Sequence, residues 1–162
     1  MKAILSPRIT AAIVVTLIFV FSSAACKKDK EAAPVDLTKK ATVTLSGAQE
    51  VPANTSTGTG TGTVTYDPTS KTVTYTFSWT LGSSTATTAN MHFHGAEDGS
   101  DIKSSGVTIG ITGFPTGNSG TMSGTTRVLT DAEAAQLLAG KWYFNIHSST
   151  IPGGELRGNI KF

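Results

Sequence analysis

Polar and apolar residues alternate along most of the chain after position 41. Segments 41–46 and 59–66 alternate in this way, and segment 72–81 is the longest such run. One face of that run carries only apolar residues, namely Val73, Tyr75, Phe77 and Trp79. A period of two is typical of β-strands with one buried face, because successive side chains point to opposite sides. We therefore predict strands in these three segments.

Turn-forming residues separate these runs from several shorter ones. Segment 67–71 (DPTSK) is predicted to be the turn of a hairpin between strands 59–66 and 72–81. Further short strands are predicted at 90–94, 107–111, 120–128, 142–147 and 155–161. Short strands with frequent turns are typical of antiparallel all-β domains. The sequence thus predicts an all-β fold, a Greek-key-like antiparallel β-sandwich or barrel.

One short helix is predicted near 131–139. Thr130 and Glu133 have the spacing of a capping box, in which each side chain bonds the other residue's backbone amide. Gly140 suits the position just after a helix. We expect this helix to pack over the sheet and to carry no chemistry.

The first 26 residues are typical of an export signal. Lys2 and Arg8 precede an apolar stretch at 11–21, which is short for a membrane span. The next small residues end at Cys26, and segment 23–26 (SAAC) resembles the lipobox of a bacterial lipoprotein, although leucine is usual at Ser23. That resemblance implies cleavage before Cys26 and diacylglycerol on its thiol. The alternative is an ordinary secretory signal followed by a stray cysteine.

Composition divides the remainder into a tether and a domain. Segment 26–40 is charged and has little to bury, whereas all 17 glycines follow position 41. We expect a signal peptide at 1–25, a disordered tether at 26–40 and one domain at 41–162. The expected location is the bacterial cell envelope, facing the periplasm or the exterior, with Cys26 holding the protein to the membrane.

The charge balance argues against nucleic acid as a partner. The sequence pI is about 8.7, but removal of Lys2 and Arg8 leaves equal numbers of basic and acidic residues. No basic run remains within 41–162. Cys26 is the only cysteine, so an intramolecular disulfide is excluded.

The three histidines are the candidate site. His92 and His94 share one face of a predicted strand, and His147 lies on the polar face of another. If these strands are neighbours, three imidazoles converge, which suits copper or zinc. Hairpin pairing would place Glu155 near His147 as an orienting partner. Three acidic residues in the loop after His94 are candidates for a fourth ligand: Glu97, Asp98 and Asp101. The alternative is that the histidines only anchor loops through hydrogen bonds.

Six short motifs together resemble the CHRD domain, which is named after chordin. They are 45–52 (LSGAQEVP), 60–68 (GTGTVTYDP), 91–95 (MHFHG), 137–140 (LLAG), 143–147 (YFNIH) and 152–158 (PGGELRG). The resemblance covers 41–162 and implies an extracytoplasmic β-sandwich without assigned catalytic residues. The histidines also resemble those of copper/zinc superoxide dismutase, but three are too few for its two-metal site.

These observations predict a lipid-anchored, monomeric binding or structural module. Its protein or small-molecule ligand is unknown, and we expect no catalytic residues. The alternative function is a copper- or zinc-binding metalloprotein that uses His92, His94 and His147. A third class is an adhesin that presents the threonine-rich strand faces.

Overall fold

The computed structural model describes residues 35–95 and 101–162, and residues 35–162 form one compact unit. Its eight strands form one antiparallel sheet in the order β5-β4-β7-β8-β1-β2-β3-β6. The first four strands are β1 (Lys39–Ser46), β2 (Thr59–Asp67), β3 (Thr72–Thr80) and β4 (Thr88–Gly95). The others are β5 (Val107–Gly110), β6 (Ser119–Thr125), β7 (Trp142–Ser148) and β8 (Leu156–Ile160).

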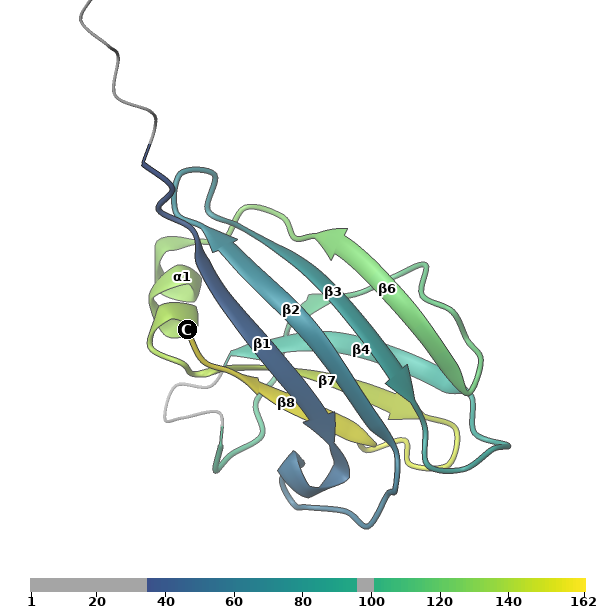
Figure 1. The fold of residues 1–162 in the computed structure, drawn as a ribbon. Coiled ribbons are helices and arrows are strands. Elements are labelled where there is room, and N and C mark those ends of the chain that lie inside the picture. The colour runs from purple at the N-terminus through teal and green to yellow at the C-terminus, as the bar shows by residue number, and fades with distance from the viewer. Residues whose placement is uncertain (1–34, 96–100) are drawn as a thin grey trace, which may run out of the picture. The chain divides into compact units, whose positions relative to one another are not determined.

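The sheet curls over on itself, so that β1, β2, β3 and β6 lie across β4, β7 and β8 (Figure 1). The two halves meet where β8 runs beside β1, with a single registered pair between Ser46 and Arg157. This arrangement confirms the all-β antiparallel prediction. Strand β1 begins at Lys39, two residues before the expected start of the domain.

An aromatic core fills the space between the two halves. Phe77 of β3 stacks on Phe144 of β7 with ring centroids 3.9 Å apart. Phe93 of β4 packs edge-on against Tyr75 at 5.2 Å. The alternation in the sequence places these rings on the inner faces, where burial of apolar surface stabilises the fold by roughly 25 cal/mol per Å². Trp79 and Trp142 are also buried in the core.

The outer face of β2, β3 and β6 carries mainly threonine and serine. Their hydroxyls bond across neighbouring strands, as in Thr76 with Ser123 and Ser78 with Thr121, both at 2.9 Å. These alternating residues are largely exposed. These bonds therefore satisfy hydroxyl groups on a solvent-facing surface and contribute little to the packing of the core.

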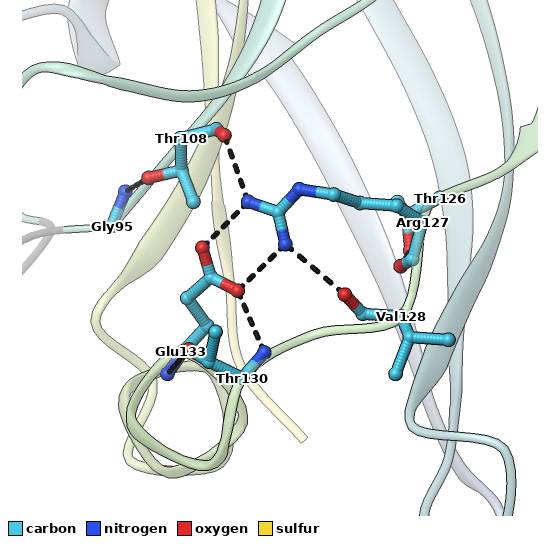
Figure 2. Close-up of polar contacts among 7 residues, drawn as sticks. All are labelled: Gly95, Thr108, Thr126, Arg127, Val128, Thr130 and Glu133. Atoms are coloured by element: carbon cyan, nitrogen blue, oxygen red, sulfur yellow. Dashed lines mark hydrogen bonds and ion pairs between the residues drawn. The ribbon is translucent and has the colours of Figure 1, made fainter.

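Helix α1 (Asp131–Leu138) begins at the predicted capping box, with Thr130 as its N-cap. Arg127 makes two bonds to the Glu133 carboxylate, at 2.6 and 2.8 Å, and a third to the Thr108 carbonyl (Figure 2). This contact ties the helix to edge strand β5. In the part of the chain that the structure describes, no helix is both long and apolar enough to span a membrane.

The ion pair between Arg127 and Glu133 should contribute to the free energy of unfolding in a way that depends on pH. The hydrogen bond from Arg127 lowers the pKa of Glu133 from 4.5 to about 2. Replacing Glu133 with Gln should therefore lower the free energy of unfolding by about 1 kcal/mol at neutral pH. Because the folded state holds Glu133 ionised, the difference should be full above about pH 4.5 and shrink as the pH falls toward 2.

Chemical denaturation of both proteins across this pH range measures the difference. Asp131→Asn is the control, because Asp131 pairs with Lys71 but its side chain is 88% exposed. It should change stability less than Glu133→Gln does. A Glu133→Gln effect that stays constant with pH would contradict the role of this ion pair.

Candidate metal centre

Strands β4 and β7 are direct antiparallel neighbours. Their register pairs Asn90 with His147 and His92 with Asn145. Residues paired in this way project from the same face of a sheet. All three histidines therefore lie on the outer face of this half, away from the aromatic core, and the two motifs that are distant in sequence become adjacent.

The three imidazole rings form one cluster. One candidate ligand atom from each of His92, His94 and His147 lies within 4.8 Å of the other two. Three atoms no farther apart than this always have a common point within 4.8/√3, about 2.8 Å, of each. Zinc–imidazole bonds are about 2.0–2.1 Å long, so this common point lies less than about 1 Å beyond bonding distance of each atom.

Backbone carbonyls orient two of the rings. The Nδ1 atom of His147 lies 2.7 Å from the Pro152 carbonyl oxygen. The Nδ1 atom of His94 lies 2.9 Å from the Ser105 carbonyl oxygen. A carbonyl only accepts hydrogen bonds, so each Nδ1 carries the hydrogen and each Nε2 keeps a lone pair. Metal-binding histidines commonly have this arrangement.

Two ring nitrogens of the cluster are buried without a hydrogen-bond partner. They are Nδ1 of His92 and Nε2 of His147. An unsatisfied buried polar atom costs about 1–3 kcal/mol, which a ligand at the site would recover. These atoms are the strongest structural indication that the cluster binds something.

Burial favours the neutral form of His92 and His94. It is the largest cause that lowers the pKa of both His92 and His94, and the neighbouring His147 lowers them further. Neutral imidazole is the ligand form, because the protonated ring has no lone pair. The lowered pKa of these two rings therefore favours the form that keeps a lone pair.

Glu155 does not take the position beside His147 that the sequence predicts. Its carboxylate accepts hydrogen bonds from the Ser56 hydroxyl at 2.7 Å and from the Gly82 amide at 2.6 Å. Burial raises the pKa of Glu155, but the Ser148 side chain and these two bonds hold it below its ordinary value. Ser148 and His147 are consecutive in β7 and face opposite sides, so Glu155 lies on the face away from the histidines. The Pro152 carbonyl orients His147 instead.

The other predicted site residues lie apart from the cluster or outside the described residues. Asp101 forms an ion pair with Lys161 at 3.2 Å. Glu97 and Asp98 fall outside the described ranges, as do Cys26 and the predicted signal segment.

The structure adds four buried polar residues around the cluster, which we call the outer-face network: Glu50, Tyr143, Asn145 and Arg157. Tyr143 stacks on the His94 ring with centroids 4.6 Å apart, and the Arg157 guanidinium carbon lies 3.5 Å from the Tyr143 ring centre. The alternation in β7 puts Tyr143 and Asn145 on the same face as His147. Glu50 follows a short 3-10 helix at Gly47–Gln49, and no periodic pattern marks it.

Glu50 and Asn145 meet beneath the loop that follows β7. The Asn145 Nδ2 atom lies 3.5 Å from Glu50 Oε1. Burial raises the pKa of Glu50, whereas Arg157 and the Asn145 hydrogen bond lower it. Asn54 fixes the loop by donating to the carbonyls of Gly154 and Glu155, at 3.0 and 3.2 Å.

A family model for the CHRD domain matches residues 41–160. The chain belongs to the CHRD domain family. The match begins in β1 and includes the last residue of β8, so it contains all three histidines of the cluster. No curated protein and no solved structure matched this CHRD domain.

Gly154 should be required for the packing of Glu50 against Asn145. Its φ of +124° is unfavourable for other residues, and an added Cβ would lie 2.6 Å from Glu50 Oε1 and 3.1 Å from Asn145 Nδ2. Gly154→Ala should therefore lower the free energy of unfolding by about 1–3 kcal/mol in chemical denaturation.

Gly153→Ala is the matched control for this prediction. An added Cβ at Gly153 meets nothing within 4 Å, so the change should stay within about 0.5 kcal/mol. Both substitutions restrict the unfolded chain in the same way. Equal stability of the two variants would contradict the proposed close packing at Gly154.

Proposed function

We propose that this CHRD domain is a metal-binding module of the bacterial cell envelope that holds copper or zinc through His92, His94 and His147. The observation that carries the proposal is the cluster of ring nitrogens, two of which are buried without a partner. Three imidazole donors suit zinc and copper better than calcium or magnesium, which prefer oxygen ligands.

The hydrogen bonds favour metal binding over a purely structural role for the histidines. Loop anchoring accounts for Nδ1 of His94 and of His147, which bond backbone carbonyls. It does not account for His92, whose Nδ1 is buried without a partner, or for Nε2 of His147. A bound metal would give these nitrogens a role.

The number of histidines argues for a single ion. The chain has three histidines, all of them in this cluster, and a dismutase-like site with two metals needs more. We therefore propose a binding or structural role and assign no catalytic residue.

Export and lipidation complete the proposed function. The charged start, the apolar stretch at 11–21 and the lipobox-like segment at 23–26 support cleavage before Cys26 and acylation of its thiol. A multiply acylated cysteine gives stable anchoring, because each buried methylene contributes about 0.8 kcal/mol. The charged segment that follows would hold a monomeric domain away from the membrane surface.

Removal of single histidines tests the metal site. His92→Ala should lower the affinity for zinc or copper by more than about 100-fold, because it removes a direct ligand. Isothermal titration after treatment with a chelator and dialysis measures this affinity. The metal-free stability of His92→Ala should fall less than that of His94→Ala, because Nδ1 of His92 has no partner and the ring has only the Asn145 side chain as a hydrogen-bond partner, whereas His94 contacts two carbonyls and Asn145.

His94→Ala distinguishes a metal site from histidines that only anchor loops. It should abolish metal uptake and also lower metal-free stability by about 1–3 kcal/mol, since it leaves buried groups unpaired. If the histidines only anchor loops, the stability loss will appear without any metal binding by the unaltered protein. Mass spectrometry of the dialysed protein, with no copper or zinc bound after loading, would establish that result.

Cys26→Ser tests the anchor. In a bacterial host, the unaltered protein should be found in the membrane fraction, with a mass that includes the acyl chains on a mature N-terminal Cys26. The variant should lose the acyl mass. An unaltered protein that is exported, cleaved and unacylated would point instead to an ordinary secretory signal.

A further inference from the structure

The amide oxygen of Asn145 faces the histidine cluster. Asn145 Oδ1 lies 3.0 Å from Nε2 of His94. The other ring nitrogen of His94 lies 2.9 Å from the Ser105 carbonyl and 3.1 Å from the Gly106 carbonyl, so it carries the ring hydrogen. Two lone pairs therefore face each other at hydrogen-bond distance, without a hydrogen between them.

A metal ion between the two atoms would accept both lone pairs and so remove their repulsion. Two donors that are each about 2.1 Å from one ion lie about 3.0–3.4 Å apart at coordination angles between about 90° and 109°. The observed 3.0 Å between Nε2 of His94 and Oδ1 of Asn145 falls within this range. The same ion would satisfy the lone pairs of His92 and His147 that lack partners.

Glu50 holds the Asn145 amide in this orientation. Its Oε1 atom lies 3.5 Å from Asn145 Nδ2, which turns Oδ1 toward the histidines. Both side chains are buried, with 8% of Glu50 and 4% of Asn145 exposed. The Glu50 amide donates to the Gly47 carbonyl at 3.1 Å, so the backbone that carries the carboxylate is itself fixed.

We propose that Asn145 Oδ1 is the fourth ligand of the metal ion, and that Glu50 is the positioning residue that aims it. This inference rests on the proposed function, because it requires an ion at the three histidines. Protein atoms then fill all four coordination positions. Structural metal sites are closed in this way, whereas catalytic sites keep a position for water or substrate. The CHRD domain therefore holds its metal for binding or stability.

Azide binding to the cobalt(II)-loaded protein tests whether the coordination shell is closed. Cobalt(II) replaces zinc as a spectroscopic probe, and its visible absorption changes when an added ligand binds. The spectrum of the unaltered protein should not respond to azide. Asn145→Ala should bind cobalt(II) about 10–100-fold more weakly and show a saturable azide response, because a coordination position is open.

Conservative variants separate coordination from general packing. Asn145→Asp keeps an oxygen donor and should stay inert to azide. Glu50→Ala should make the site respond to azide, whereas Glu50→Gln, whose amide oxygen still accepts from Asn145 Nδ2, should restore the inert state. Asn118→Ala is the matched control, because Asn118 donates to the carbonyls of Leu81 and Ser83 away from the cluster. It should behave like the unaltered protein.

The outcomes distinguish the two proposals. A saturable azide response in the unaltered protein would overturn Asn145 as a ligand and leave the three-histidine site intact. Failure of the unaltered protein to bind cobalt(II), zinc or copper would overturn both. The measurement on the unaltered protein is decisive even if Asn145→Ala folds poorly.

Discussion

The pairing of β4 with β7 is the constraint on which the site depends. It places Phe93 opposite Phe144 on the inner face and His92 opposite Asn145 on the outer face. A slip of one residue would move every side chain of one strand to the other face. The aromatic core excludes that slip, because the stack of Phe77 on Phe144 would be lost and a histidine would enter an apolar interior. The same packing that stabilises the fold therefore fixes the geometry of the histidines.

The second constraint is that polar groups on the outer face are buried. Arg157 has no exposed surface, and its Nη2 donates to the Lys103 carbonyl at 3.0 Å. The Tyr143 hydroxyl accepts a hydrogen bond from the Ser105 amide at 3.0 Å. Loop backbone thus covers the outer-face network, where the low dielectric strengthens each satisfied contact and penalises each unsatisfied one. Such an environment favours neutral imidazoles and makes unpartnered ring nitrogens costly.

The two outer surfaces of the curled sheet have different chemistry. The face of β2, β3 and β6 pairs its hydroxyls with one another and remains open to solvent. The face of β4, β7 and β8 gathers histidine, carboxylate and guanidinium groups under loops. Within the described residues, only on the second face do polar groups converge and include buried atoms without a partner in the protein.

Local sequence patterns were sufficient to predict the eight strands, the capped helix and the face of each histidine. These features depend on alternation and capping, which act over a few residues. The sequence could not show that β4 and β7 are neighbours, nor that Glu50 reaches Asn145 from a residue 95 positions away. Glu155 shows most clearly what local pattern does not determine. Hairpin pairing predicted Glu155 near His147, but its carboxylate accepts a hydrogen bond from Ser56. The sequence determined which side chains face outward, whereas tertiary packing decided which of them meet, because loop conformation and strand order arise only from contacts between distant segments.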